Sequence, residues 1–307
     1  MPHLDIVLNN ISNLLENEEH KVSPSMESLG AFGGNMARLA SKRVAPAVER
    51  EASSKLTVYA SDIGKGCMRQ LWYKTNQPEV TNKIDAPTNW RFLQGDVIEE
   101  TTLFLVEQAG HEVTDRQSGY AEVVYDVEFR GRIDCRIDGI LVDVKSMSDF
   151  GFKKATKLRT YPDQLDDPWG YGYQLAFYER GFSTIESPAF FMVNKVSGEM
   201  AYRHLEPTFT NTIFTRMVDV AFAVQSSTPV ALSRVELKPA DAVGQKLSSM
   251  CHICPFMFKC WADQGVRGFL YAEGIRWYGK VNKPARVPEV SFEFIASGGE
   301  VEIIKSF

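Results

Sequence analysis

The sequence lacks a long apolar run, a leader pattern and a cysteine framework. No eighteen consecutive residues are apolar, which excludes a membrane-spanning helix. Residues 1–5 read Met-Pro-His-Leu-Asp, without the basic region and apolar run of a secretory signal, so we predict a cytoplasmic protein. Only five cysteines occur, and this odd number argues against disulfide pairing and favours metal ligation or burial.

The sequence also lacks a net positive charge. The formal net charge of −5 gives no overall attraction to nucleic acid, so any such contact must come from a local basic patch. Lys153, Lys154, Lys157 and Arg159 form one, within seven residues that contain no acid. This patch predicts contacts with DNA phosphates, and the alternative is a solvated helix face. With 307 residues, of which 44% are hydrophobic, the chain can bury a large core.

The segment 129–146 predicts a β-hairpin that carries charged side chains on one face. Asp138-Gly139 is a two-residue turn signal between two runs rich in β-branched residues. With that turn, Ile137 pairs with Ile140 and Asp134 falls opposite Asp143. Like charges in that arrangement destabilise a sheet unless a divalent cation with oxygen ligands compensates them.

Lys145 lies two residues after Asp143 and therefore points to the same face of the predicted hairpin. An ammonium group there can position a water and offset charge that develops on a phosphate oxygen. The alternative is an ordinary surface hairpin whose Asp and Lys side chains face water. Asp138 shares the parity of Asp134, but its place in the turn indicates a loop former.

The cysteines are concentrated near the C-terminal end of the chain. Cys251, Cys254 and Cys260 are spaced C-x2-C-x5-C, and Cys67 can supply a fourth thiol. Four thiolates suit either zinc or an iron-sulfur cluster, and the spacing does not choose between them. Cys135 alternates with isoleucines on the apolar face of the predicted hairpin, which indicates a buried thiol.

Periodicity and turn signals predict the remaining elements. Helices are expected over 3–17, 61–73, 88–109, 165–180 and 208–225, strands over 123–129, 188–195 and 199–205, a loop over 19–34, and a terminal hairpin over 289–307. The order of helices and strands predicts an α/β fold with a central mixed sheet flanked by helices. We predict an N-terminal helical arm over 1–55, a main domain over 56–265 and a C-terminal extension over 266–307.

Four motifs in order resemble those of RecB-like nucleases in the PD-(D/E)XK superfamily. They are Gly95-Asp-Val-Ile-Glu99, Gly131-Arg-Ile-Asp134, Asp143-Val-Lys145 and Gln174-Leu-Ala-Phe-Tyr178. The early lone Cys67 and the late cysteine triplet are similar to the iron-sulfur branch, which includes the CRISPR-associated Cas-four family and the nuclease domain of AddB. The resemblance covers about residues 60–262, and such single-module nucleases are frequent in phage genomes.

The resemblance implies a restriction-endonuclease-like fold and a role for each motif. Glu99, Asp134, Asp143 and the Val144 position would bind Mg²⁺ or Mn²⁺, with Lys145 as the catalytic lysine. Gln174 and Tyr178 would orient the site and the DNA, although a pair one turn apart is also an ordinary helix-surface contact. The implied ligands of a [4Fe-4S] cluster, acting as a structural clamp, are Cys67, Cys251, Cys254 and Cys260.

The implied function is a metal-dependent DNA exonuclease that prefers single-stranded ends and acts 5′ to 3′. The implied partners are DNA, recombination or CRISPR adaptation proteins and other copies of the chain, in the host cytoplasm if the gene is phage-encoded. One alternative is a non-catalytic DNA-end-binding or adaptor module. Another is a zinc-stabilised interaction protein in which the Asp-x-Lys sequence is accidental.

Overall fold

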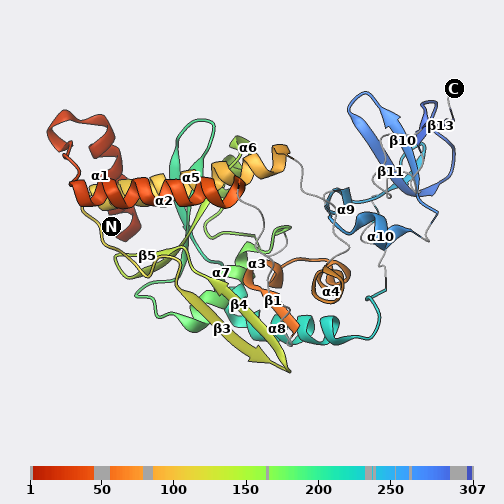
Figure 1. The fold of residues 1–307 in the computed structure, drawn as a ribbon, viewed down its shortest axis with the longest axis horizontal. Helices are drawn as coiled ribbons and strands as arrows, with labels where there is room; N and C mark the ends of the chain where they lie inside the picture. The colour runs from red at the N-terminus through yellow and green to blue at the C-terminus, as the bar shows by residue number, and fades with distance from the viewer. Residues whose placement is uncertain are drawn as a thin grey trace. The chain divides into compact units, whose positions relative to one another are not determined.

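The computed structural model contains a mixed five-stranded sheet within residues 85–221, and this sheet includes the predicted hairpin (Figure 1). Its strands, in spatial order, are β2 (Val113–Thr114), β5 (Cys135–Ile137), β6 (Ile140–Met147), β7 (Ala189–Asn194) and β8 (Met200–His204). β6 and β7 are parallel, and the other neighbours are antiparallel. The structure describes residues 3–44, 56–78, 86–163, 166–231, 237, 240–252, 254–262, 265–290 and 303–305.

The β5–β6 hairpin turns at Asp138-Gly139, as predicted. Both turn residues have positive φ, 47° and 82°, as a two-residue type I′ hairpin turn requires. The predicted pairing of Ile137 with Ile140 is confirmed. The Asp138 carboxylate also fixes the turn, because it accepts hydrogen bonds from Glu112 N at 2.9 Å and from His111 Nδ1 at 2.7 Å.

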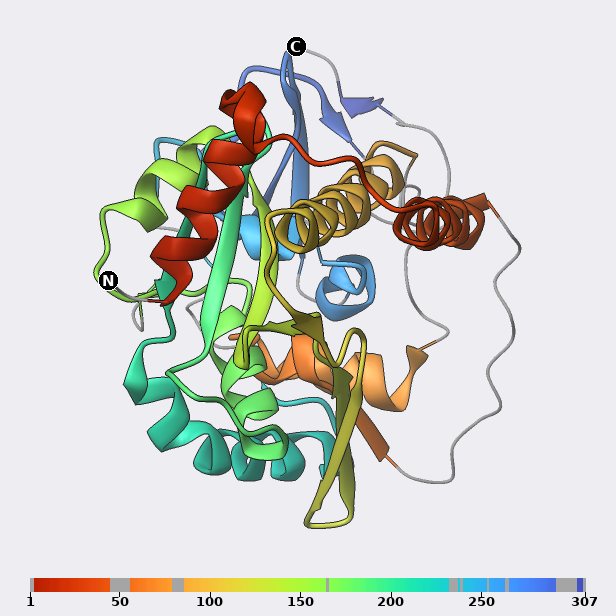
Figure 2. The ribbon, with the colours of Figure 1, turned by 90° about the vertical axis from the view of Figure 1, so that its left-hand side faces the viewer.

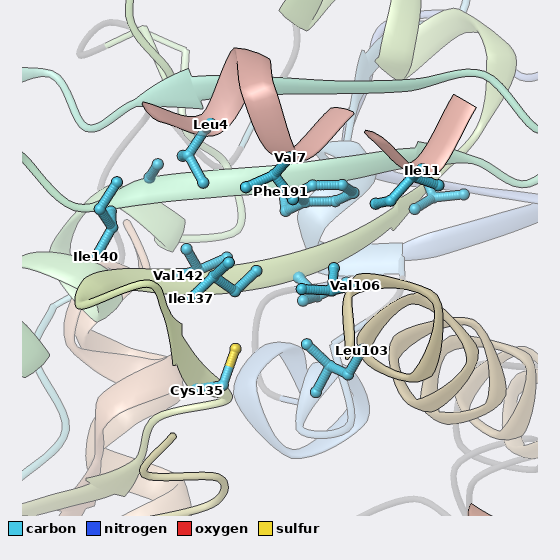
Figure 3. Packing of buried hydrophobic residues seen from close by; sticks show 13 residues of the cluster. Leu4, Val7, Ile11, Leu103, Val106, Cys135, Ile137, Ile140, Val142 and Phe191 are labelled. Carbon is cyan, nitrogen blue, oxygen red and sulfur yellow. The ribbon is translucent and has the colours of Figure 1, made fainter. Parts of the chain in front are cut away.

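One face of the central sheet is covered by α1 (His3–Glu16) and α5 (Ala86–Gln108), as Figure 3 shows. Leu4, Val7 and Ile11 of α1 are almost completely buried in the same cluster as the strand residues. Cys135 is fully buried there, as predicted. The helix predicted over 3–17 is therefore confirmed, and it belongs to the core that carries the hairpin.

The loop predicted over 19–34 is wrong, because a short 3-10 turn (η1, Glu18–His20) and α2 (Met26–Val44) occupy this region. Glycines disfavour a helix here by intrinsic propensity. Contacts with α5 outweigh this low helix propensity. The Phe32 and Phe104 rings lie 4.7 Å apart, and Arg43 donates to Asp96 at 2.7 Å. α2 runs beside α5 in both overall views (Figures 1 and 2).

Two further sequence predictions are wrong in detail. The strand expected over 123–129 is interrupted at Tyr125-Asp126, whose φ values of 47° and 61° form a turn between two strands. The helix expected over 61–73 is broken in two. The resulting elements are β1 (Leu56–Tyr59), α3 (Ala60–Ile63), α4 (Met68–Asn76), β3 (Gly119–Val124) and β4 (Val127–Arg132), with β1, β4 and β3 forming a three-stranded sheet.

The helices and strands after the hairpin follow the predictions more closely. The predicted elements are found as α7 (Tyr171–Gly181), β7, β8 and α8 (Pro207–Gln225), whereas α6 (Asp149–Thr156) was not among the predicted helices. α7 begins six residues later than predicted, after Gly170 at φ 77°. The architecture is mixed α/β with mixed sheets flanked by helices, as predicted. None of the described helices has the length and apolar character needed to cross a membrane.

The chain divides into two units, 1–66 with 85–221 and 67–84 with 222–307. The second contains α4, α9 (Ser249–His252), α10 (Met257–Trp261), β9 (Gly244–Lys246), β10 (Arg267–Tyr271), β11 (Gly274–Val281), β12 (Glu289–Val290) and β13 (Ile303–Lys305). β12 pairs antiparallel with β13, while the predicted turn at Gly298-Gly299 lies outside the described residues. The predicted domain boundaries at 55 and 265 remain predictions, because compactness does not test independent folding.

Candidate active site

A buried carboxylate, Asp143, and a half-buried one, Asp134, meet at the open end of the β5–β6 hairpin. Asp143 lies on β6 with 1% of its surface exposed, and Asp134 immediately precedes β5, one residue beyond the Cys135–Val142 pair. Asp134 Oδ2 accepts a hydrogen bond from Val144 N at 2.8 Å. Burial, followed by the charges of Asp143 and Glu99, holds the pKa of Asp134 well above its ordinary value. Ionising both acids together is therefore costly in this site.

Lys145 places a positive charge beside the Asp143 carboxylate. Its Nζ lies 2.5 Å from Asp143 Oδ2. Yet neither Asp143 oxygen receives a well-aligned hydrogen bond from the described part of the chain. Burial lowers the pKa of Lys145, but the charges of Asp143 and Asp134 outweigh it, so the pKa lies above its ordinary value and the group is an ammonium at neutral pH.

Glu99 reaches this cluster from α5. Burial, followed by the charge of Asp143, raises its pKa to about 7. Gln117 Nε2 donates to Glu99 Oε1 at 3.1 Å. The neighbouring Glu100 instead binds Arg116 and Asn35, at 2.5 and 2.8 Å, so these two adjacent acids have different surroundings.

α7 contributes the predicted Gln174 and Tyr178. Tyr178 is 3% exposed, and burial raises its pKa above the ordinary value although a hydrogen bond with Gln174 acts in the opposite direction. The charges of Asp143 and Asp134 also act on this hydroxyl, so the structure brings α7 and the carboxylates together. The assigned roles of all six residues in the chemistry remain predictions.

One contact of α7 was not predicted from the sequence. The Lys145 ammonium lies 4.7 Å from the centre of the Tyr171 ring. The Asp167 carboxylate accepts backbone N–H groups of Gly170, Tyr171 and Gly172 at 2.8–3.0 Å, which fixes the first turn of the helix. An Asp three residues before Gly170 is the signal that could have placed this helix start.

Gly131 explains how Tyr178 fits against β4. A Cβ at Gly131 would lie 2.8 Å from the Tyr178 hydroxyl and 2.6 Å from Ala60 Cβ. We expect Gly131→Ala to displace the ring and to lower the free energy of unfolding by about 1–3 kcal/mol, as overpacking does. Urea denaturation measures this change.

Gly33→Ala is the matched control, because a Cβ there has nothing within 4 Å and the position is inside α2. It should stabilise the protein by about 0.5–1 kcal/mol. Equal stability of Gly131→Ala and the wild type would contradict the tight packing of Tyr178.

The basic patch predicted after the hairpin is only partly available for phosphates. It lies on and after α6, where Lys153 pairs with Asp149 at 2.8 Å and Lys154 pairs with Asp166. Both acids lie outside residues 153–159, the acid-free segment from which the basic patch was predicted. The proposed contacts of Lys153, Lys154, Lys157 and Arg159 with DNA remain predictions.

The predicted cysteine ligands all belong to the second unit. Burial, together with the charges of Cys67, Cys251 and Cys260, raises the pKa of Cys254 to about 12, which requires the four thiols to be neighbours. Arg69 Nε donates to Cys260 Sγ at 3.1 Å.

The predicted four-cysteine clamp is nevertheless not shown as a formed ligand set. Within the described ranges, no three or more His, Cys, Asp or Glu side chains converge tightly enough to hold a metal ion, and this applies to the carboxylate cluster as well. The metal and cluster ligands therefore remain predictions from the sequence.

Comparisons with known proteins do not assign a family. No protein-family profile and no curated protein matches the chain. The solved structure of the protein SSO0001 is 14% identical with a TM-score of 0.39, over 74% of this chain and 94% of that chain. A protein from Eubacterium rectale, described as a "putative exonuclease", is 13% identical with a TM-score of 0.28, over 76% of this chain and 99% of that one. Similarities this low carry no argument about fold or function, so the resemblance to RecB-like nucleases remains a prediction.

Proposed function

We propose that this protein hydrolyses DNA phosphodiester bonds with the aid of a divalent metal ion. The observation that carries the proposal is the Asp143 carboxylate, which is buried beside Asp134 and lacks well-aligned hydrogen bonds within the described residues. Burying a carboxylate without sufficient compensation costs several kcal/mol. The Lys145 ammonium lies near three carboxylates, those of the buried Asp143, the half-buried Asp134 and Glu99. A bound cation would therefore offset negative charge in this cluster.

The chemical types of these donors suit a hard divalent cation, although the described side chains do not converge as a formed ligand set. Asp143, Asp134 and Glu99 provide carboxylate oxygens, and Val144 provides a backbone carbonyl, which are the ligand types that Mg²⁺ and Mn²⁺ prefer. When bound, such an ion polarises a phosphate oxygen and lowers the pKa of a water molecule.

Lys145 is the residue that would act on the phosphate. Its ammonium is held between Asp143 and the Tyr171 ring, so it presents a fixed positive charge to an oxygen that becomes more negative during cleavage. The hydrogen-bonded Gln174 and Tyr178 line the same site and can fix the orientation of a phosphodiester.

The finer features of the proposed function come only from the resemblance. They are exonuclease action on single-stranded ends, 5′ to 3′ direction, and work alongside recombination or CRISPR adaptation proteins. Incubation of 5′- and 3′-labelled single and double strands with Mg²⁺, Mn²⁺ or EDTA tests both cleavage and direction. Equal products with and without EDTA, or no products at all, would exclude metal-dependent cleavage.

We also propose that Cys67, Cys251, Cys254 and Cys260 hold a [4Fe-4S] cluster. The Arg69 guanidinium supports this, because a positive group that donates to the half-buried Cys260 sulfur stabilises a thiolate, the form that binds metal. Zinc is the other candidate for this donor set. The visible absorbance of protein purified without oxygen decides between them, since an iron-sulfur cluster is brown and a zinc site is colourless.

Asp134→Asn should raise the melting temperature of the metal-free protein at neutral pH. The raised pKa of Asp134 means that its ionised form costs stability, and an amide oxygen can still accept from Val144 N. A gain of about 1 kcal/mol corresponds to roughly 2–4 °C in a protein of this size. Added Mn²⁺ should stabilise the variant less than the wild type.

Asp138→Asn is the control, and it should change the melting temperature in the opposite direction. Burial raises the pKa of Asp138, but hydrogen bonds from Glu112 N and His111 outweigh it, so the pKa is lowered and the ionised form adds stability. This variant should melt at a lower temperature and respond normally to Mn²⁺. A lower melting temperature for metal-free Asp134→Asn, or a Mn²⁺ response equal to that of wild type, would remove Asp134 from the metal site.

A further inference from the structure

α2 and α5 pack antiparallel and so bring one end of each helix together. The pairs along their interface run in opposite order, from Gln108 with Ser28, through Phe104 with Phe32, to Asp96 with Arg43. The C-terminal turns of α2 therefore lie beside the N-terminal half of α5.

Exposed cations and aromatic rings gather at this end. Trp90 is 61% exposed and Phe92 is 45% exposed, and the Arg43 guanidinium lies 5.3 Å from the centre of the Phe92 ring. We call this region the α2–α5 surface, and it consists of Arg38, Lys42, Arg43, Trp90, Arg91 and Phe92. Two large exposed aromatic side chains among basic groups are unusual for a solvated face. In a chain of net charge −5, such a local concentration of cations attracts an anionic ligand.

The α2–α5 surface is connected to the carboxylate site through α5. Phe92 and Glu99 are seven residues apart on this helix, so they lie on nearly the same face and about 10 Å apart along the axis. A stacked strand rises about 3.4 Å along its axis per nucleotide, so roughly three nucleotides bridge this distance.

We propose that the α2–α5 surface binds single-stranded nucleic acid and guides it to the carboxylate site. Arg38, Lys42 and Arg91 contact phosphates, while Phe92 offers a face on which a base stacks. Charge and aromatic character would also suit an anionic lipid surface, but the alignment of Phe92 with Glu99 favours a strand that continues into the site. The guiding role rests on the proposed function, whereas the binding itself does not.

Fluorescence anisotropy with a labelled oligothymidylate, in EDTA so that no cleavage occurs, tests the binding. Phe92→Ala should weaken binding by at least about fivefold, the lower end of the effect of losing one stacked base. The double variant Arg38→Ala with Lys42→Ala should reduce the slope of log K against log salt by up to about 1.4, at 0.7 per phosphate contact.

Phe214→Ala is the matched control, because Phe214 is 49% exposed and lies 5.5 Å below the Arg180 guanidinium, but on α8. It should bind like the wild type. Wild-type affinity and salt slope in the α2 and Phe92 variants would overturn the proposal, as would binding to phosphatidylserine vesicles without binding to the oligonucleotide. Phe92-dependent binding by a protein that never cleaves DNA would retain the surface and reject the proposed function.

Discussion

Lys145→Ala is expected to lower kcat for DNA cleavage by at least about 100-fold, the usual effect of removing one preorganised group that stabilises developing charge. DNA affinity measured in EDTA should change little. The reason is that Lys145 is only 17% exposed and is held by Asp143 and the Tyr171 ring, so it is placed to act on the reacting phosphate and not on the rest of the strand. Single-turnover cleavage with Mn²⁺ and anisotropy in EDTA separate the two effects.

Loss of folding must be distinguished from loss of chemistry, because removing Lys145 leaves Asp143 buried without its counter-charge. Breaking a buried pair costs about 3–5 kcal/mol. The double variant Lys145→Ala with Asp143→Asn removes both charges, and it should recover stability while remaining inactive. Lys195→Ala, in the exposed turn between β7 and β8, is the control and should keep full activity. Wild-type turnover in folded Lys145→Ala would remove the hairpin from the mechanism.

The geometry of the site was predictable where local rules determine it. Asp138-Gly139 specifies a two-residue turn, and this turn sets the pairing of β5 with β6 and brings Asp134 next to Asp143. The burial of Asp143 was not predictable. β6 lies between β5 and β7, but residues 189–194 are distant in sequence and nothing in the hairpin itself reveals a parallel neighbour.

Other parts of the fold depend on contacts that the sequence pattern hides. α2 contains three glycines and forms because α5 supports it, while Tyr125 adopts a positive φ that its residue type rarely does. The β10–β11 pair was not predicted, although Gly274 at φ 120° marks its turn. The contact between Lys145 and Tyr171 joins β6 to α7, and only the folded chain shows it.

Cys67→Ser is expected to remove iron, brown colour and thermal stability together. The second unit is built from two separate segments, 67–84 and 222–307. Within it, the Tyr73 and Phe256 rings stack at 5.8 Å and Arg69 contacts Cys260, so α4 is joined to the later cysteines by side-chain packing. A cluster bound by both segments would add a cross-link between them.

The size of this effect follows from the length of chain that the cross-link closes. Cys251 lies 184 residues after Cys67. The chain-entropy treatment of disulfides gives about 5 kcal/mol for so long a loop, which serves as an upper guide for a metal centre. That is comparable with the whole stability of many domains, about 5–15 kcal/mol. Calorimetric melting and iron analysis of protein purified without oxygen measure the loss.

Cys135→Ser separates loss of a ligand from loss of a buried thiol. Cys135 is fully buried in the core of the first unit, so a hydroxyl there should cost about 1–3 kcal/mol. Its iron content should equal that of the wild type. If Cys67→Ser instead keeps its iron and melting temperature while Cys135→Ser loses iron, Cys67 is not the fourth ligand. Among the described residues, the packing of α4 then remains as the link between the two segments of the second unit.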